Sequence, residues 1–573
     1  MTATAFFPQS YPHQWLPEEI ELKTWEQIEP WYCRLLERPI ESPAQLETWL
    51  REMGELSCAV SQEGAERYIA MTCQTDDAER EAAYLAWVRD VEPKLKALQN
   101  ELRSKYLDCP HRGALGKDRY LVFDRAEENR RALFRAANIP RETELAELGQ
   151  QYQKLVGAMT VTFRGEERTL AQMAPFLEET DRSTRQGAWE LVARRRLADR
   201  DTLDDLFDRM IQLRVAVAHE AGFANYVDYA YRNRERFDYG VADAERFQQA
   251  IERLVVPLAR RLQKERSSAL GVETLRHWDL SVDPKGRPPL RPFTEAEKLA
   301  TGAEAIFSDV DPELGRQFAY LRSHGLLDLA NRKGKAPGGY QTTLEDDRLP
   351  FIFMNAVGVD GDVRTILHEG GHAFHALASR GEPLAAYRES PIEFCEVASM
   401  SMELLGASHL ETFYKPADRA RSYRHLLEEI VLILPWIATV DAFQHWVYTH
   451  PEHTREERRG AWTSIHQRYS GNVDWSGYEA ERANLWHRQL HIYLYPFYYI
   501  EYGIAQLGAL QVWQHARTDR AVAVAAYRHA LSIGGARPLP ELFSAAGIRF
   551  DFSAATIAPL METLGEELEQ FED

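Results

Sequence analysis

The sequence predicts a mainly α-helical protein, and three observations lead to that class. Apolar residues recur at helical spacing over long stretches, for example in 82–88 and 203–218. Residues that begin helices are repeated along the chain, such as Ser42 followed by Pro43, and Asp181. Runs of alternating Val and Thr, which would predict strands, are few.

The chain is long enough for more than one compact unit, because 573 residues exceed the usual length of a single domain. We place a helical N-terminal region at 1–190 and a second region, which carries the motifs described below, at 191–573. The formal net charge of −20 argues against nucleic acid as a partner, because binding phosphates requires clustered Lys and Arg. An acidic surface mainly promotes solubility.

Cysteine usage and hydropathy predict a cytoplasmic protein without a membrane segment. Residues 1–19 lack a basic stretch followed by an apolar one, so we expect no secretory signal. The most apolar run, 430–440, contains Pro435 and is shorter than the ~20 residues of a membrane span, which favours a buried helix or a kinked core segment. The cysteines are odd in number and form no CxxC pair, as expected for reduced thiols; they are Cys33, Cys58, Cys73, Cys109 and Cys395.

Two interruptions of the helical pattern, 279–292 and 331–339, predict loops. Segment 334–340, rich in glycine, predicts a mobile loop near a cleft, with a plain connector as the alternative. The apolar segment 349–355 predicts a strand, placed at a sheet edge because of Pro350. An edge strand can hold an extended peptide by main-chain hydrogen bonds, whereas an ordinary core strand is the alternative.

Segment 362–381 predicts a helix, because Asp360 or Asp362 can cap its N-terminus and Gly381 can end it. Apolar residues repeat along one face of this helix. An adjacent polar stripe carries three histidines, which therefore line one side.

The spacing of two of these histidines predicts a metal site. His368 and His372 are four residues apart, so their imidazoles lie one above the other and can bind one Zn²⁺ at about 2.0–2.1 Å. Glu369 projects about 100° around the helix from His368, so it can reach a metal-bound water as general base. Residues 219–223 begin in the same way but have Phe223 in place of the second histidine, which excludes this mode of chelation.

Gly370 and Gly371 lie between the two histidines, where each glycine costs about 1 kcal/mol in a helix interior. Such a conflict with helix propensity is typical of functional sites. We interpret the pair as an open face that lets a substrate or another backbone approach, and a close helix crossing is the alternative.

A catalytic zinc usually takes three protein ligands, so a third ligand is needed. Segment 390–405 begins with Ser-Pro and predicts a helix on which Glu393, Glu396 and Glu403 fall near one face. The residues alone leave Glu393 and Glu396 open as the ligand, and either can instead orient a ligand histidine. We interpret Glu403 as a solvated or structural acid.

These motifs resemble the thimet oligopeptidase-like zinc peptidases, and within them the oligoendopeptidase F branch. The N-terminal part is similar to that family only in its helical character. The implied fold is an almost all-α, two-lobed bowl or clamshell with a deep central channel and a small β element beside the zinc helix. The stretches that carry the resemblance are 350–355, HEGGHAFH at 368–375, EFCEVASMSMELL at 393–405, 491–503 and 532–548.

The resemblance implies one Zn²⁺ per chain, with His368, His372 and Glu396 as its ligands. The family's third ligand corresponds to Glu396 rather than Glu393. His375 also matches a family position, and we interpret it as a packed histidine because three ligands already suffice.

The aromatic segment 491–503 matches the part of the family that binds substrate and stabilises the tetrahedral intermediate. The corresponding residues are His491, Tyr498 and Tyr502, with Tyr495 as a further candidate. Their N–H and O–H groups suit a developing oxyanion. At Ile500 the family often carries another tyrosine, so this chain departs from the pattern and lacks that hydroxyl.

The implied activity is hydrolysis of internal peptide bonds in short unstructured peptides. A zinc-bound water attacks the carbonyl, and Glu369 acts as general base. Two alternatives are a protein that binds zinc or peptide without cleaving, and an exopeptidase.

Overall fold

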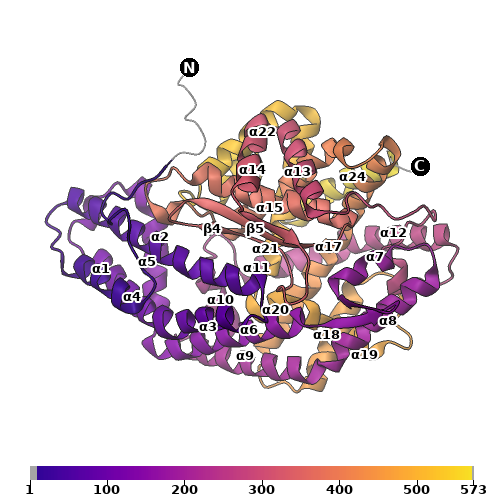
Figure 1. Ribbon diagram of the computed structural model, residues 1–573, viewed down its shortest axis with the longest axis horizontal. Helices are drawn as coiled ribbons and strands as arrows, with labels where there is room; N and C mark the ends of the chain where they lie inside the picture. The colour runs from indigo at the N-terminus through magenta and orange to yellow at the C-terminus, as the bar shows by residue number, and fades with distance from the viewer. Residues whose placement is uncertain (1–9, 571–573) are drawn as a thin grey trace.

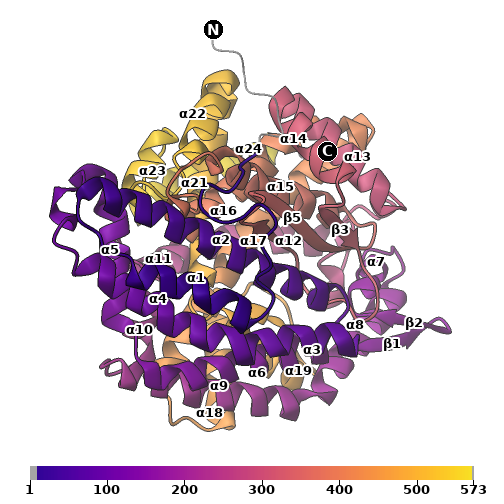
Figure 2. The same ribbon diagram turned by 60° about the vertical axis from the view of Figure 1, so that its left-hand side comes forward.

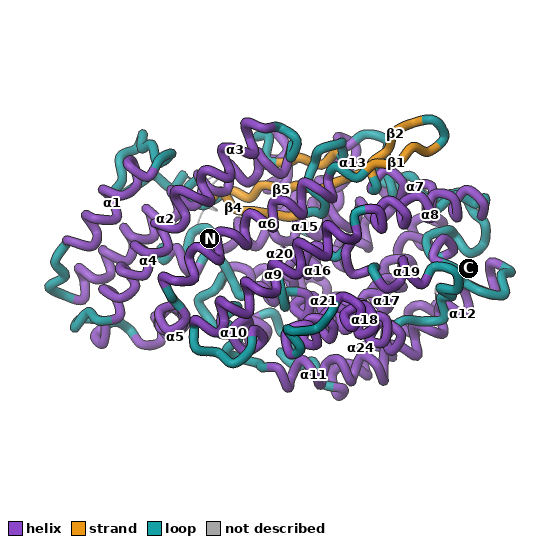
Figure 3. Tube along the Cα trace, turned by 90° about the horizontal axis from the view of Figure 1, so that it is seen from below, coloured by secondary structure: helices purple, strands orange, loops and turns teal. Residues whose placement is uncertain are grey.

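The structure is a computed structural model that describes residues 10–570. Residues 1–9 and 571–573 lie outside that range. The first of these segments is part of residues 1–19, from which we predicted the absence of a secretory signal. Helices dominate, and the strands gather along one side of the molecule in the view of Figure 3. The predicted mainly α class is confirmed. Within residues 10–570, no helix combines the length and apolar character of a membrane span.

The first part of the described chain consists of helices with one β-hairpin between α6 and α7. The elements are α1 (Trp25–Glu37), α2 (Pro43–Cys73), α3 (Ala78–Ala86), α4 (Glu92–Leu107), α5 (Lys117–Leu133), α6 (Ile139–Gly157), β1 (Thr160–Phe163), β2 (Glu166–Thr169), α7 (Ala174–Leu177), α8 (Arg182–Ala198), α9 (Arg200–Glu220), α10 (Tyr226–Asn233), α11 (Val241–Ala250) and α12 (Val256–Leu270).

The remainder contains a small sheet followed by more helices. The elements are α13 (Ala296–Val310), α14 (Pro312–Ser323), β3 (Leu327–Ala330), β4 (Tyr340–Leu344), β5 (Leu349–Ala356), α15 (Asp360–Ser379), α16 (Ile392–Gly406), α17 (Pro416–Thr449), α18 (Arg455–Tyr469), α19 (Glu479–Ala483), α20 (Leu490–Leu494), α21 (Tyr499–Thr518), α22 (Arg520–Ser532), α23 (Leu539–Ala545) and α24 (Ala554–Gln570).

The predicted helix starts form by side-chain capping. Ser42 accepts a hydrogen bond from the N–H of Gln45 at 3.3 Å, directly before α2. Asp181 accepts from the N–H of Thr184 at 2.8 Å, before α8. Each cap satisfies an N–H that the helix itself cannot pair. The apolar run with Pro435 lies within α17 and is largely buried, as predicted, with Leu432 as its exposed member.

The helices enclose two large hydrophobic cores. One core draws on α1, α2, α4 and α5, the indigo helices of Figure 1, and it also takes in Leu384 and Tyr387 from the segment that follows α15. Tyr387 is 1% exposed, and its hydroxyl donates to the carbonyl of Arg119 at 2.7 Å and accepts from the N–H of Phe123 at 3.1 Å. The second core extends from Cys73 to Leu568 and surrounds α15.

The small sheet has the order β3-β5-β4, so β5 is central and β4 is an edge strand. The prediction of an edge position for β5 was wrong. β5 pairs with β3 only from Ile352 onward, so Pro350 lies beyond the end of β3 and its missing N–H leaves no gap in that ladder. On its other side β5 pairs antiparallel with β4. Helix α2, the sheet and α15 lie side by side in Figures 1 and 2.

Segment 331–339 is a loop, as predicted. The contacts made within 334–340, the part predicted to be mobile, do not fit a mobile loop. Lys335 is buried and donates to the carbonyl oxygens of Asp328 and Ala330, at 3.0 and 2.9 Å. The N–H of Ala336 donates to the carbonyl of Thr72 on α2 at 2.8 Å. The loop is therefore fastened both to the sheet and to the N-terminal helices.

Candidate active site

Helix α15 begins at Asp360 and ends at Ser379, slightly earlier at both ends than predicted. Val359 is the N-cap residue, rather than either aspartate. Asp362 instead reaches back and accepts hydrogen bonds from the N–H groups of the turn before the helix, including that of Gly358 at 2.7 Å. A negative charge at this end also suits the helix dipole.

The side chains predicted as metal ligands converge on one point. Glu396 Oε2 on α16 lies 3.3 Å from His368 Nε2 and 3.5 Å from His372 Nε2 on α15. Glu393, the other candidate, accepts a hydrogen bond from the hydroxyl of Tyr239 at 2.6 Å and lies outside this group of donors. The structure thus brings Glu396 to the histidines, and not Glu393.

The spacing of these donors suits a small metal ion. Two ligand atoms bound at about 2.1 Å with a tetrahedral angle lie about 3.4 Å apart, close to the distances of 3.3 and 3.5 Å between Glu396 and the two histidines. Neutral imidazoles and a carboxylate are the donor types that Zn²⁺ takes in catalytic sites. The residues present therefore fit zinc.

Glu369 lies beside the donors and is held apart from other polar groups. Its side chain is buried, and Oε2 has no hydrogen-bond partner among the described residues. Burial raises the pKa of this carboxyl above its ordinary value. A Cβ at Gly339 would lie 3.2 Å from Glu369 Oε1, so the backbone of the loop before β4 approaches the carboxylate closely. A buried carboxylate without a partner is typical of a catalytic group.

Glu403 has a role that the sequence did not predict. His368 donates through Nδ1–H to Glu403 Oε1 at 2.7 Å, which leaves the lone pair of Nε2 directed at the metal position. Glu396 and Glu403 are seven residues apart on α16, two helical turns on one face, and this spacing was the available signal. His375 is buried with Nε2 2.9 Å from Ser390 Oγ, outside the donor group, and burial lowers its pKa to about 3.

The two glycines of α15 serve the packing of helices. A Cβ at Gly371 would lie 2.5 Å from the Cα of Ser399 on α16, and one at Gly370 would lie 2.3 Å from the ring of Phe307 on α13. Neither position can hold a side chain without movement of its neighbour. The interpretation as an open face for substrate was wrong, because α16 and α13 occupy that space. The close crossing of α15 and α16 is what brings Glu396 to the histidines.

The aromatic segment lies against the same centre. The Tyr498 hydroxyl donates to Glu396 Oε1 at 2.5 Å, and His491 Nε2 lies 3.1 Å from the Tyr502 hydroxyl. Burial lowers the pKa of His491 to about 4, which favours its neutral form. Tyr495 is 41% exposed. Ile500 is fully buried, so the residue that departs from the family pattern faces the core.

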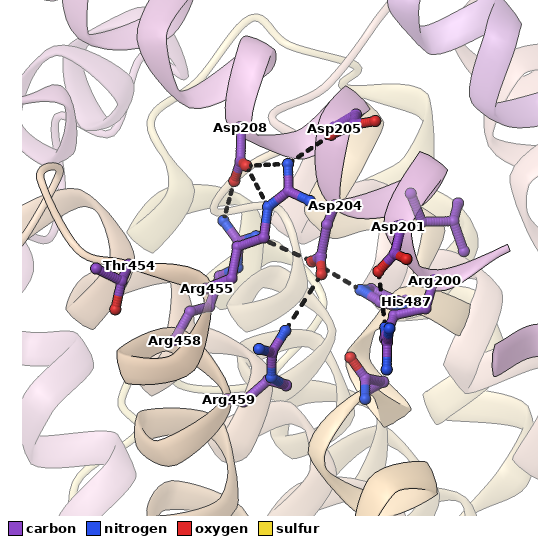
Figure 4. A network of polar contacts seen from close by, with 12 residues as sticks. Arg200, Asp201, Asp204, Asp205, Asp208, Thr454, Arg455, Arg458, Arg459 and His487 are labelled. Carbon is purple, nitrogen blue, oxygen red and sulfur yellow. Dashed lines mark hydrogen bonds and ion pairs between the residues drawn. The ribbon is translucent and has the colours of Figure 1, made fainter.

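A buried polar network anchors the segment that precedes α20 (Figure 4). Asp204 on α9 accepts from Arg458 Nη2 on α18 at 2.9 Å, and its Oδ1 lies 3.2 Å from His487 Nε2. The Tyr152 hydroxyl donates to the carbonyl of His487 at 2.9 Å. Through His487 this network fixes the chain four residues before His491.

A cavity of about 500 Å³ adjoins these groups. Its wall contains Tyr68 and Thr72 of α2, so the N-terminal helices contribute to it. The wall also contains every predicted site residue, namely His368, Glu369, His372, Glu396, His491, Tyr498 and Tyr502.

The class of protein follows from this geometry. Metal-dependent hydrolases typically have imidazole and carboxylate donors that face one point from two packed helices. They also typically have a second carboxylate, without a partner, beside these donors. The sequence profile of Peptidase family M3 matches residues 176–562, and that of the Peptidase M3 N-terminal domain matches residues 17–132. The chain belongs to peptidase family M3, in its oligoendopeptidase F branch, which confirms the resemblance.

Several relatives of known description are similar to this chain. Oligopeptidase PepF of Bacillus subtilis strain 168 is 24% identical over 269 residues, which cover 45% of this chain and 39% of that protein. The chromosomal oligoendopeptidase F of Lactococcus lactis subsp. cremoris is 24% identical over 204 residues, 36% of this chain and 31% of that protein. In these alignments the chain spans less than half the length of either relative.

Solved structures match over nearly the whole chain. A PZ peptidase A with an inhibitor has 30% sequence identity and a TM-score of 0.92, covering 97% of this chain and 98% of that one. A protein described as an oligoendopeptidase F from Bacillus anthracis strain Ames has 27% identity and a TM-score of 0.87, covering 97% and 99%. The helical architecture is therefore that of the family.

Proposed function

We propose that this chain is a zinc-dependent endopeptidase that hydrolyses internal bonds of short unstructured peptides. The observation that carries the proposal is the buried, unpartnered Oε2 of Glu369 beside the converging donors of His368, His372 and Glu396. An unpaired buried carboxylate costs free energy, and its retention at this point calls for a chemical role.

Each residue of the site has a task in this proposal. Zn²⁺, one ion per chain, held by the two histidines and Glu396, would polarise the scissile carbonyl and lower the pKa of the attacking water. Glu369 takes a proton from that water and later gives it to the leaving amine. Glu403 holds His368 in the tautomer that presents Nε2.

The aromatic residues hold the substrate and the developing negative charge. His491 is neutral near pH 7, because its pKa is lowered to about 4, so it can donate an N–H to a carbonyl oxygen. Tyr498 and Tyr502 present hydroxyls at the same cavity wall. A group that donates to the oxyanion contributes about 3–4 kcal/mol to transition-state stabilisation.

The shape of the cavity supports short peptides as substrates. A volume of about 500 Å³ accommodates a few residues of an extended chain and excludes a folded protein. Residues of β4, the edge strand of the sheet, contribute to its wall. Main-chain groups of an edge strand can pair with an extended peptide.

Replacement of Glu369 tests the proposed function. We expect Glu369→Gln to bind one zinc per chain and to lose about 10²–10⁴-fold in kcat on a quenched fluorescent peptide. The matched control is Glu220→Gln, because Glu220 follows His219 in the same dipeptide on the surface of α9 and lies far from the donors in the chain. This control should keep full activity.

The substrate and the metal are tested on the same peptide. Blocking both of its termini should leave cleavage intact, whereas an exopeptidase would lose it. A chelator should abolish cleavage, and added zinc should restore it. Full turnover by zinc-loaded Glu369→Gln would contradict the proposed role of Glu369, and a zinc-loaded wild type without cleavage would leave only a binding function.

A further inference from the structure

The turn before Tyr498 has an unusual backbone. Phe497 has φ 63°, in the left-handed region that residues with a side chain rarely adopt. Glu235, in the turn after α10, has φ 55°. Such conformations are unfavourable and persist only where the surroundings hold them in place.

Hydrogen bonds connect these two turns, and the donors are the arginines directly before and after Glu235. Arg234 donates through Nε to the carbonyl of Pro496 at 2.8 Å, and Arg236 donates through Nη2 to the carbonyl of Phe497. The carbonyls of Pro496 and Phe497, one on each side of the strained φ angle of Phe497, are therefore fixed. We call Arg234 and Arg236 the arginine clamp.

Further contacts make the clamped conformation rigid. The N–H of Phe497 donates to Gln444 Oε1 at 2.7 Å, and the Phe497 side chain is fully buried. The Arg236 side chain is also fully buried and donates to Glu501 Oε1 at 2.8 Å. The turn is thus bound at its N–H, at its carbonyls and at its side chain.

The clamped turn sets the direction of Tyr498. This tyrosine follows Phe497 directly, and its hydroxyl meets Glu396 Oε1 at 2.5 Å. The Arg234 guanidinium also lies over the Tyr498 ring, 5.2 Å from its centre. If φ of Phe497 relaxed to an ordinary value, the Tyr498 ring would swing away from Glu396.

We propose that Arg234 and Arg236 are positioning residues, which store backbone strain at Phe497 in order to aim the Tyr498 hydroxyl at the catalytic centre. This inference rests on the proposed function for its effect on turnover. Its geometric part concerns Tyr498 alone and is testable without any activity.

A double-mutant cycle tests the effect on turnover. Arg234→Lys keeps the charge but removes the Nε–H and the planar face, and Arg234 is only partly buried, so the variant should fold. We expect kcat to fall about tenfold with KM nearly unchanged, because a misplaced group mainly affects the transition state. In the Tyr498→Phe background the same substitution should have no further effect. Independent, multiplicative losses would overturn the proposal.

The matched control is Arg232→Lys, an exposed residue on the last turn of α10, two positions before Arg234. It should keep the kcat and KM of the wild type. An equal fall of kcat in this control would assign the effect to the helix end in general and overturn the role of Arg234.

A spectroscopic measurement separates this inference from the proposed function. With 3-fluorotyrosine at position 498, the ¹⁹F NMR signal should shift or broaden in Arg234→Lys and stay unchanged in Arg232→Lys. An unchanged signal in Arg234→Lys would overturn the clamp, even in an active enzyme. A protein that fails to cleave peptides but shows the shift would lose the proposed function and keep the clamp.

Discussion

Two clusters of buried and partly buried charged side chains in this molecule differ in how their charges are balanced. The paired cluster joins α9, α18 and the segment before α20, and the metal cluster joins α15 and α16. In the paired cluster every carboxylate meets an arginine; its members are Asp204, Asp208, Arg455, Arg458 and His487. Within residues 10–570 no Lys or Arg forms an ion pair with the metal cluster, whose members are His368, Glu369, His372 and Glu396.

The difference separates a structural role from a chemical one. Hydrogen bonds and ion pairs lower the pKa of Asp204 although burial opposes this, whereas burial raises the pKa of Glu369. A buried charge that is fully paired joins elements together. A buried charge left unpaired is available for a ligand.

Breaking the paired cluster should give the largest loss of stability. Arg458→Met leaves Asp204 buried without its nearest cationic partner, which we expect to cost about 3–5 kcal/mol in the free energy of unfolding. Urea denaturation measures this loss. Arg459→Met, which removes a longer and more exposed contact to the same aspartate, should cost much less.

The same urea experiment on the metal-free Glu369→Gln variant sharpens the comparison. Because Glu369 Oε2 has no partner to lose, its free energy of unfolding should stay the same or rise. A loss as large as that of Arg458→Met would show that the metal cluster is also structural, and the distinction would fail.

The helix crossing beneath the metal cluster is the next most sensitive point. Gly371→Ala should cost about 1–3 kcal/mol and weaken zinc binding, because the new methyl meets the backbone of α16. Gly187→Ala on α8 is the control, since its Cβ would meet no atom within 4 Å. Thermal melting and zinc titration measure both variants, and equal behaviour would contradict the packing role of Gly371.

Glu403 should affect the zinc affinity of the metal cluster without being one of its ligands. We expect Glu403→Ala to weaken zinc binding about ten- to hundredfold, because His368 loses the acceptor that fixes its tautomer. Competition with a chromogenic chelator measures the change. The control is Glu562→Ala on α24, an exposed residue outside every cluster of possible metal ligands among the described residues, and it should bind zinc like the wild type.

Acid should weaken the paired cluster. The pKa of Asp204 is lower than its ordinary value, so its contribution to stability is present above about pH 3.9 and is lost as the pH falls below that value. Between about pH 5 and pH 3, urea midpoints should fall more steeply for the wild type than for Asp204→Asn. Parallel curves would show that Asp204 titrates alike in the folded and unfolded chain.

Structural features that depend on residues of a single helix could be predicted from the sequence. The spacing of His368 and His372 along a single helix fixes their relative position, and Ser42 and Asp181 act on the first turns of their own helices. All five cysteines lie within the described residues and form no disulfide there. The boundary at residue 190, the zinc-binding and catalytic roles and the cytoplasmic location stay predictions.

Contacts between distant elements could not be predicted from local patterns, and Glu396 was placed with the histidines only through the resemblance to the family. The central position of β5 depends on β3 and β4, and no local pattern reveals which strands pair. The packing role of Gly371 depends on the crossing of α15 by α16. A glycine in the sequence does not by itself distinguish close packing from access for a substrate. The contact between Arg234 and Pro496 joins residues 262 positions apart.

The position of Tyr387 couples the two cores mechanically. The segment 380–391 leaves α15, enters the N-terminal core at Leu384 and Tyr387, and returns to begin α16, which carries Glu396. If the N-terminal helices were pulled away as a rigid body, Tyr387 would have to leave its core or draw this connection along. Any movement of the N-terminal helices relative to the second core is therefore transmitted as tension to the link between α15 and α16.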